Sequence, residues 1–348
     1  MILASVGCDG DPPIDADAGG DAGLDAGPPM IDAGPPPPPN VRFVTFNVGN
    51  PDDTELDYPL RLSVQSYEDH IAARIAEWTP DVIVLQEVLA PRMCEALMEG
   101  DPSRTCFDHA ARPPAARRLL GDDYSIVCDM RLQVECIGVH TSFGTIDGVA
   151  SGELALMGAE TPDLPLPACN YAAGECSDAA CDGEATVSAV SVTTTRGPLR
   201  VVHMHPNASG FDAAGTLYLG APCRTEQTRQ AFMLAGAGPA LMLGDWNFNP
   251  DSIVYRMESE VWNENVGEGL RFTDHSERDP GGTRVPTLAG TISAAIDHVV
   301  TDFAIGSCEV IRDPRVDAAY DFSALPGGEA YAARIDHRPV VCDLHWPD

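Results

Sequence analysis

The apolar residues of this chain fall into short runs that are bounded by Gly, Pro, Asn or Asp. Runs without alternation, such as residues 82–85 and 240–243, are typical of strands that are covered on both faces. Strands are further predicted at residues 41–46, 124–127, 134–139, 153–157, 187–195, 199–204, 299–300 and 340–344. The pattern therefore predicts a protein that is rich in strands.

Helical spacing is found in fewer places. Ile71, Ile75 and Trp78 recur at helical spacing, and the proline that follows them ends the predicted helix. Two further helices are expected at residues 224–234 and 252–258, and a long loop at residues 100–122. Many strands with helices between them on one chain predict sheets that pack together and are covered by helices.

The first forty residues have a different composition. Residues 9–40 repeat Asp-Ala-Gly and end in five prolines, with almost no large apolar side chains, so we expect a disordered tether. Residues 1–8, MILASVGC, resemble a truncated lipoprotein signal of bacteria, in which Cys8 would carry the lipid. Nothing in the chain approaches the roughly 18 consecutive apolar residues of a membrane-spanning helix.

The chain is strongly acidic. Its formal net charge is −32 over 348 residues, and its 21 basic residues are all Arg. Subtracting the seven Asp of residues 9–40 leaves −25 on the remainder, so the acidity belongs to the folded part too. Such a surface repels polyanions at long range, which disfavours tight binding to duplex nucleic acid or anionic lipid. An adaptation for solubility or for salt tolerance also explains the negative charge. The same charge would attract divalent cations, which suits a metal-dependent enzyme.

Eleven cysteines are many for a reduced compartment, and no paired CxxC spacing points to structural zinc. Without Cys8 ten remain, an even number that fits an oxidising location. The local pairs we expect are Cys94–Cys106, Cys128–Cys136 and Cys308–Cys342. Cys169, Cys176 and Cys181 cluster in an insertion at residues 165–185, where either disulfides or a metal site would fit.

Six of the apolar segments carry a polar residue of the metal-binding or acid–base type at one end. These residues are Asn47, Glu87, His205, Asp245 with Asn247, Asp297, and Asp336 with His337. Strand ends lie at the rim of a sheet, where several strands can converge on one site. Four carboxylates, two amides and two imidazoles there indicate a hydrolytic site for an anionic ester.

The ordered segments TFNV, LQEV, VVHMH, LGDWN, IDH and IDHRPV resemble the motifs of the endonuclease/exonuclease/phosphatase family, which has the deoxyribonuclease-I-like fold. RTEQTRQAFML is similar to the helix that precedes GD-x-N in that family. The resemblance implies that residues 41–348 are one catalytic domain. It further implies a four-layer α/β sandwich, with two packed, mainly antiparallel β-sheets flanked by helices, and hydrolysis of phosphate esters with Mg²⁺ (or Mn²⁺ or Ca²⁺).

The resemblance also implies a metal site. Glu87 would be the principal carboxylate ligand, with Asn47 beside it, and Asp336 would join a second metal position. Oxygen ligands of this kind suit Mg²⁺, which keeps part of its water shell.

The remaining motif residues have implied catalytic and substrate-binding roles. Asp245 would orient or deprotonate the attacking water, and Asn247 would hydrogen-bond a phosphate oxygen. His337, oriented by Asp297, would contact the scissile phosphate. His205 would stabilise the charge that gathers on phosphorus. Arg338 is a candidate phosphate contact, although a solvated side chain explains it equally well.

Some positions stay open. His203 and His205 share one face of a strand, so either is a candidate for the functional histidine, and both together are candidates for a transition-metal site. The stretch VECIGVHTSFGTI lacks the Arg and Pro that relatives carry, so Glu135 and His140 are candidates only for a further acid or base. We expect His298 to be structural.

The sequence thus predicts an exported, divalent-metal-dependent phosphoesterase, either secreted or held at the cell surface or facing the periplasm through a lipid on Cys8. A nuclease or phosphodiesterase is the first reading. A phosphatase or sphingomyelinase-like phospholipase C is the alternative. The expected absence of an exposed apolar loop, such as a pair of exposed aromatics, disfavours insertion into lipid. A non-catalytic surface binding lipoprotein is the third. We expect a monomer and predict no protein partner.

Overall fold

The computed structural model describes residues 39–49, 65–88, 113–129, 135–157, 166–167, 186–206, 210–211, 217–218, 221–289, 294–312 and 336–348. Cys8, the tether up to residue 38, the pair Cys94–Cys106 and the cysteines of the 165–185 insertion lie outside these ranges. At Asp336 the backbone alone is described. Residues Pro37–Asp348 form one compact unit.

The first large sheet joins both ends of this unit. Its seven strands run in the order β16-β18-β1-β2-β4-β3-β6. They are β1 (Val41–Asn47), β2 (Val82–Gln86), β3 (Tyr124–Asp129), β4 (Cys136–His140), β6 (Leu154–Met157), β16 (Ile305–Val310) and β18 (Val340–His345). β1 is an inner strand, paired in parallel with β2 and antiparallel with β18. Its β-branched and aromatic side chains are buried on both faces of the sheet, as expected for such a strand.

The second large sheet is built from the middle of the chain. Its main path is β13-β15-β12-β9-β8-β5, and β7 pairs with β8. The strands are β5 (Gly144–Ile146), β7 (Leu166–Pro167), β8 (Thr186–Thr194), β9 (Gly197–His205), β12 (Ala240–Asp245), β13 (Thr273–Asp274) and β15 (Asp297–Thr301). Two short pairs complete the strands: β10 (Gly210–Phe211) with β11 (Leu217–Tyr218), and β14 (Leu288–Ala289) with β17 (Asp336–His337).

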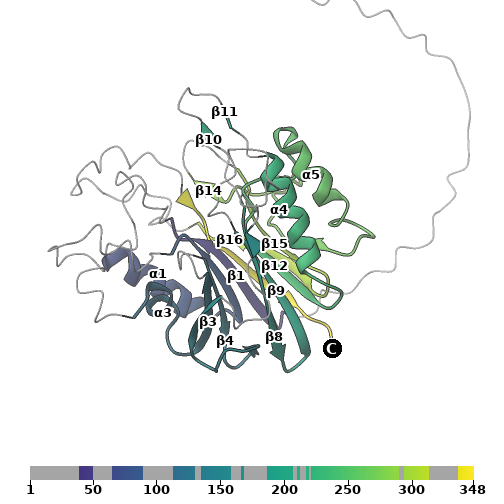
Figure 1. The fold of residues 1–348 in the computed structure, drawn as a ribbon. Helices are drawn as coiled ribbons and strands as arrows, with labels where there is room; N and C mark the ends of the chain where they lie inside the picture. Colours follow the sequence, from purple (N-terminus) through teal and green to yellow (C-terminus); the bar gives the residue numbers. More distant parts are fainter. Residues whose placement is uncertain are drawn as a thin grey trace, which may run out of the picture. The chain divides into compact units, whose positions relative to one another are not determined.

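Three buried clusters define four layers (Figure 1). The middle cluster lies between the two sheets and includes Phe43 and Val84 of the first and Val201 and Leu243 of the second. The outer clusters lie under helices, α1 (Gln65–Trp78) and α3 (Ala115–Leu120) on the first sheet and α4 (Ala221–Leu234) and α5 (Arg256–Asn263) on the second. The predicted fold class, an α/β sandwich of two packed, mainly antiparallel sheets flanked by helices, is confirmed.

Two helical predictions need correction. α3 forms inside the predicted loop at 100–122, because Ala115, Ala116, Leu119 and Leu120 bury a short apolar face against the first sheet. The predicted helix at 252–258 is a 3₁₀ turn, η4 (Ile253–Tyr255), followed by α5. None of the helices in the described ranges is long and apolar enough to cross a membrane.

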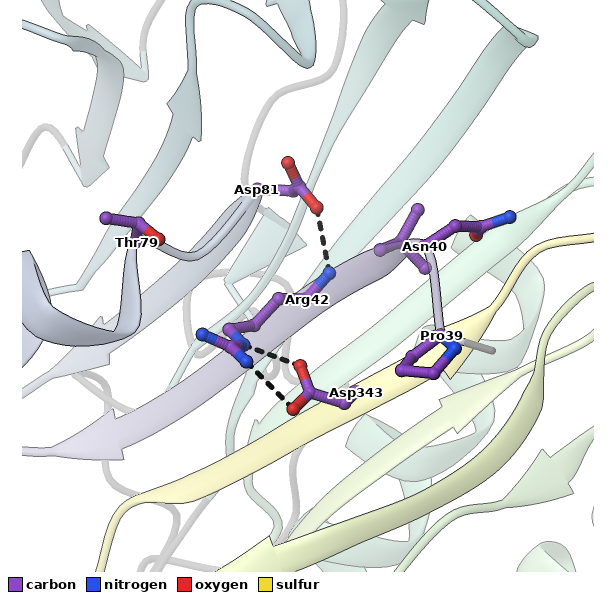
Figure 2. A pocket seen from close by; sticks show the side chains of 7 residues that line it. Pro39, Asn40, Arg42, Thr79, Asp81 and Asp343 are labelled. Carbon is purple, nitrogen blue, oxygen red and sulfur yellow. Dashed lines mark hydrogen bonds and ion pairs between the residues drawn. The ribbon is translucent and has the colours of Figure 1, made fainter. Parts of the chain in front are cut away.

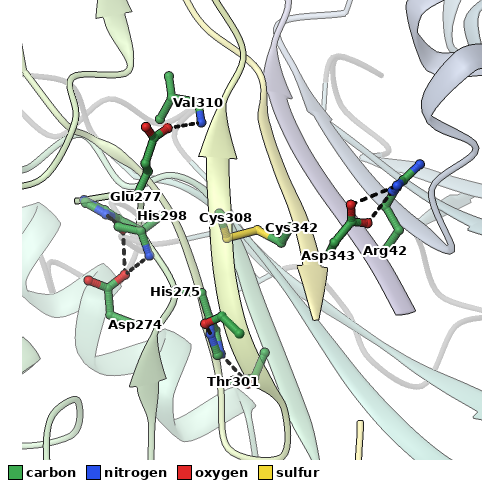
Figure 3. The surroundings of a disulfide bond; sticks show 12 residues. Arg42, Asp274, His275, Glu277, His298, Thr301, Cys308, Val310, Cys342 and Asp343 are labelled. Carbon is green, nitrogen blue, oxygen red and sulfur yellow. Dashed lines mark hydrogen bonds and ion pairs between the residues drawn. A yellow bond between two sulfur atoms is a disulfide. The ribbon is translucent and has the colours of Figure 1, made fainter. Parts of the chain in front are cut away.

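Two of the predicted disulfides are confirmed. Cys128–Cys136 joins β3 and β4 at directly opposed positions. Cys308–Cys342 joins β16 and β18 in the same way, next to the Arg42–Asp343 ion pair (Figure 3). Each bond therefore ties two neighbouring strands of the first sheet.

A shallow pocket of about 250 Å³ lies at the start of β1. Figure 2 shows the Arg42 guanidinium bound to Asp343 and the Arg42 backbone N–H bound to Asp81. Burial raises the pKa of Asp81, although the hydrogen bond from Arg42 opposes this. The predicted site residues lie at the other end of the strands, so this pocket is separate from them.

Candidate active site

Seven polar side chains meet at one edge of the two sheets. They are Asn47, Glu87, Glu135, His205, Asp245, Asp297 and His337. β1 and β2 are parallel, as are β9 and β12, so each pair ends at one edge. β4 and β15 run antiparallel to these strands and therefore begin at the same edge. The strand ends predicted from sequence thus do converge.

Asn47 links the two sheets. Its amide nitrogen donates to Glu87 Oε1 at 2.9 Å and to Asp245 Oδ2 at 3.3 Å. Its amide oxygen accepts the backbone N–H of Gly49 at 2.9 Å. In this orientation the amide holds both carboxylates in place. The predicted role of Asn47 as a metal ligand stays a prediction.

His337 is anchored by a buried carboxylate. Its Nδ1 lies 2.9 Å from Asp297 Oδ2, and its Nε2 lies 3.5 Å from Asp245 Oδ2. Thr287 fixes Asp297 in turn, because its hydroxyl accepts the Asp297 backbone N–H at 3.1 Å. The structure therefore brings these predicted partners together.

His205 has a matching anchor on the opposite side. Its Nδ1 lies 2.7 Å from Oε1 of Glu135, whose side chain is almost fully buried. Its Nε2 lies 3.7 Å from Glu87 Oε1 and 3.8 Å from Asp245 Oδ2. Glu135 was one of two candidates for a further acid or base in the sequence, since a lone Glu in an apolar segment carries little signal. The other candidate, His140, lies at the far end of β4 and bonds Ser142.

His203 is fully buried behind His205. Its Nε2 lies 3.1 Å from Oε2 of Glu135, and Ser188 Oγ lies 3.5 Å from its Nδ1. His205, and not His203, therefore faces the exposed edge of the site; the functional role of His205 stays a prediction.

Burial and charge shift the pKa values of these groups. Burial alone would lower the pKa of His205 and of His337, but the carboxylates around them outweigh it and raise these values to about 10 and about 9. Burial would raise the pKa of Glu135, yet the two imidazoles lower it to about 2. Burial and the charge of Asp297 raise the pKa of Asp245 to about 6, against the opposing effect of both histidines. The site therefore holds two imidazolium groups around a weakened acid.

Backbone strain marks the same edge. Glu87 and Asn247 both adopt φ of 55°, in the left-handed region that non-glycine residues rarely enter. Such conformations persist where surrounding structure enforces them, and they cluster at functional sites. At Asn247 the backbone N–H binds Asp245 Oδ1 at 2.8 Å, and the side-chain amide donates to Pro206 O at 2.9 Å.

Two predicted residues remain to be placed. Arg338 is half-buried and donates to Pro286 O at 3.2 Å, so its guanidinium is partly engaged by the protein. The side chain of Asp336 lies outside the description, and its predicted place at a metal stays a prediction. The roles of Arg338 and Asn247 toward a phosphate likewise stay predictions.

The donor set suits a hard divalent cation. Ligand atoms of Asp245, Asp297 and His337 all lie within 4.8 Å of one another. The carboxylate of Glu87 adjoins them through Asn47. Burial is the main cause of the raised pKa of Asp245, and the charge of Asp297 adds to it; a bound cation would favour the ionised form of this carboxylate.

Comparisons with known proteins agree with this geometry at the level of the fold. No family model and no curated protein matches the sequence. An endonuclease/exonuclease/phosphatase structure from Bacteroides vulgatus matches with a TM-score of 0.50 and 16% identity, over 88% of this chain and 99% of that chain. The D. rerio TDP2 structure, complexed with single strand DNA product, matches with a TM-score of 0.50 and 13% identity, over 88% and 98%.

At such identities the likeness concerns the fold alone. The fold is that of endonuclease/exonuclease/phosphatase structures, as the sequence motifs predicted.

Proposed function

We propose that this protein is a metal-dependent phosphoesterase, and that its substrates are phosphodiesters. The observation that carries the proposal is the convergence of two carboxylate-anchored imidazoles on Asp245. Nε2 of His205 and Nε2 of His337 lie 3.8 and 3.5 Å from the same oxygen of this carboxylate. A carboxylate base, Asp245, that lies between two imidazolium groups suits the attack of water on an anionic ester.

The reaction would divide between these residues. Asp245, with its pKa raised to about 6, is a stronger base than an ordinary Asp and would accept the proton of the attacking water. His205 and His337 are charged at neutral pH and would offset the charge that develops on the phosphoryl oxygens. As the P–O bond breaks, His337 Nε2 would protonate the leaving oxygen.

The implied cation would be held by Glu87, with the predicted help of Asn47 and Asp336. When bound, such an ion polarises a phosphoryl oxygen and offsets its charge. We favour Mg²⁺ because the donors are oxygens, with Mn²⁺ or Ca²⁺ as substitutes.

Nucleic acid is the first substrate class to test. The matched TDP2 structure holds a single strand DNA product, and this supports a single strand over a duplex. The net charge of −32 points the same way, because a flexible single strand has a lower charge density than a duplex.

The test is turnover by the full, oxidised chain with Mg²⁺, Mn²⁺, Ca²⁺ or EDTA. Substrates are single-stranded DNA, plasmid DNA, RNA, bis-p-nitrophenyl phosphate and p-nitrophenyl phosphate. Cleavage of a diester that EDTA abolishes supports the proposal. Activity on the monoester alone would make the protein a phosphatase, and silence on every substrate would favour a binding module.

A second candidate substrate is a phosphodiester in a lipid headgroup. Three apolar side chains that follow Asn247 in the chain are exposed: Ile253 by 89%, Val254 by 50% and Met257 by 48%. Exposed aliphatic side chains suit contact with an apolar surface.

Phosphatidylcholine vesicles and the soluble diester distinguish the two classes. If the substrate is a lipid, Ile253→Ser with Val254→Ser reduces turnover of vesicles and leaves the soluble diester unchanged. If the double variant turns over vesicles as fast as wild type does, and the soluble diester as well, a lipid substrate is excluded.

Export and anchoring remain proposals. Two disulfides in the described ranges support an oxidising compartment. Mass spectrometry of the protein from its native cell would show whether Cys8 carries a lipid.

A further inference from the structure

We propose that His203 is a positioning residue that acts through Glu135 to fix the catalytic imidazole of His205. The inference rests on the proposed function, since it assigns His205 a part in the reaction. It concerns a side chain that touches no substrate, because His203 is completely buried.

The two histidines and Glu135 form one connected unit. His203 and His205 are alternate residues of β9, so both side chains leave the same face of the second sheet. Glu135 comes from the first sheet, immediately before β4, and its carboxylate reaches across. Oε1 lies 2.7 Å from Nδ1 of His205, and Oε2 lies 3.1 Å from Nε2 of His203. Each carboxylate oxygen therefore faces one imidazole.

The contact with His203 gives Glu135 a defined orientation. Oε2 of Glu135 and Nε2 of His203 lie 3.1 Å apart as a close polar contact, and within the described ranges neither atom has a hydrogen-bonding partner. A carboxylate held at one oxygen alone can rotate about its last bond, whereas contacts at both oxygens fix its plane. The fixed plane sets the direction in which His205 Nδ1 points.

The backbone fixes the other end of Glu135. Its N–H donates to Asp129 Oδ1 at 2.9 Å, and its carbonyl accepts the N–H of Asp129 at 2.9 Å. With Nδ1 directed at Glu135, the opposite nitrogen of His205 faces Glu87 and Asp245. His203 thus acts on the orientation of the ring.

The arrangement argues against a transition metal shared by the two histidines. Both ring nitrogens that face inward are already within 3.1 Å of a carboxylate oxygen, so no ion fits between them. The outer nitrogen of His203 lies 3.5 Å from Ser188 Oγ. Nε2 of His203 thus faces the Glu135 carboxylate and Nδ1 faces the Ser188 hydroxyl.

The experiment compares two substitutions in the full chain. His203→Met removes the donor at similar volume, and His203→Gln keeps an N–H donor at the corresponding position. We expect kcat on bis-p-nitrophenyl phosphate to fall about tenfold in His203→Met with KM unchanged, and to recover to within about twofold of wild type in His203→Gln.

His275→Met is the matched control for a structural loss. His275 is also buried and bonds Thr301 Oγ1 (Figure 3) and Gly306 O, but it is not one of the seven side chains of the candidate site. We expect this control to unfold at a lower temperature than wild type while its kcat stays unchanged. A kcat in folded His203→Met equal to that of wild type would overturn the proposal.

A double substitution tests the route through Glu135. If His203 acts only through this carboxylate, His203→Met adds no further loss of kcat to Glu135→Gln. Losses that multiply in the double variant would contradict the route.

A readout without turnover separates this inference from the proposed function. In ¹⁵N-histidine spectra we expect the Nδ1–H proton of His205 to be observable in wild type and in His203→Gln and to be lost in His203→Met. Suppose that the signal is lost in His203→Met and that wild type turns over no substrate. This result would support the positioning role of His203 and reject the proposed phosphoesterase activity. A signal unchanged in His203→Met would reject the positioning role whatever the activity.

Discussion

At the scale of single residues, Gly244 has a steric reason to precede Asp245, the candidate catalytic carboxylate. Its φ is 148°, and a Cβ placed there would lie 1.9 Å from the carbonyl oxygen of Met204 on the neighbouring strand. β9 and β12 approach closely only because this side chain is missing. The glycine of the GD-x-N motif therefore has a steric reason.

Gly244→Ala should be severely destabilising. We expect a loss of more than about 4 kcal/mol in the free energy of unfolding, since backbone must move on both strands. Gly236→Ala is the control, because Gly236 also has positive φ, of 63°, but has open space around it. Its expected loss is about 1 kcal/mol. Urea denaturation measures both, and similar losses would refute the steric argument.

His275 gives a prediction for pH. Burial lowers its pKa below 6.5, although its bond to Gly306 and the charge of Asp274 oppose this. Below pH 6.5 the unfolded chain binds the proton more readily than the folded one. The stability that His275 contributes is therefore complete above that pH and is lost as pH falls.

The comparison with His275→Gln isolates this effect. We expect wild type to be more stable than the variant at pH 8, and the difference to narrow below pH 6.5 by up to about 1.4 kcal/mol per pH unit. Chemical denaturation from pH 8 to pH 5 gives the difference. A constant gap over this range would show that His275 titrates normally in the folded state.

The residues of the site were predictable to different degrees. Asp245 and His337 stand in motifs whose order along the chain is informative, and the structure brings them together. The part played by Glu135 was not predictable, because it depends on the distance between two sheets and not on spacing in sequence. The burial of His203 depends on the same packing.

At the scale of elements, α4 and α5 are joined by a buried ion pair. Both side chains are completely buried, and Arg224 Nη2 lies 2.7 Å from Glu258 Oε1. The guanidinium also lies over the ring of Tyr255, 5.2 Å from its centroid. Because both charges are buried, removing either side chain leaves the charge of the other less well compensated.

Glu258→Leu should cost about 3–5 kcal/mol, because it removes the Glu258 carboxylate from its contact with a completely buried guanidinium. Adding Arg224→Met should restore most of this loss. The exposed pair Arg256–Glu260 on α5 is the control, and Glu260→Ala should cost less than about 0.5 kcal/mol. Thermal unfolding of the four proteins tests the pattern, and a double variant as unstable as Glu258→Leu would contradict it.

Removal of the two disulfides should have different effects on stability and on activity. Cys308–Cys342 closes a separation of 34 residues and Cys128–Cys136 one of 8. By chain entropy their removal should cost about 4 and about 2.5 kcal/mol respectively. Cys128–Cys136 lies next to Glu135, so its removal should lower kcat more, despite the smaller loss of stability.

Paired Cys→Ala variants measure both quantities. The expected result is an inverse order, in which the less destabilised variant is the less active one. If activity simply follows stability in the two variants, the hairpin does not hold Glu135 in place.

Element prediction failed where local pattern and packing disagree. α3 is only six residues long, and its Arg117 and Arg118 interrupt the apolar signal. The helix after Asn247 was placed too early, because Ser252 and Asp251 indicate a start that the chain uses for a 3₁₀ turn. Strands with continuous apolar runs, such as β2 and β12, matched their predictions closely.

At the scale of the whole molecule, net charge should govern activity on polymers. With −32 on the chain, repulsion slows encounter with a polyanion, and salt screens it. The screening length falls from about 30 Å at 0.01 M to about 10 Å at 0.1 M.

Raising NaCl over this range at constant Mg²⁺ should therefore increase kcat/KM on single-stranded DNA. The rate on bis-p-nitrophenyl phosphate, which carries one charge, is the control and should change little. A decrease on DNA would indicate a basic binding groove that overrides the net charge.

The four layers could be predicted because the motifs indicated them and the strand pattern agreed. The way in which the sheets share the site could not. Asn47, Glu87 and Glu135 belong to the first sheet, while His205, Asp245 and Asp297 belong to the second. Their meeting depends on how the two sheets are docked, which no local pattern specifies.

The pairing of β1 with β18 brings both ends of the domain to one place. Asn40 donates its N–H to Leu344 O at 2.9 Å, and its side chain accepts the N–H of Trp346. Asn47, at the other end of β1, is roughly 20 Å away at about 3.3 Å per residue. A resin or fusion partner coupled at Asp348, which follows β18 and is described, would thus be attached far from the candidate site. Preparations immobilised through the C-terminus should consequently keep their access to long polymers.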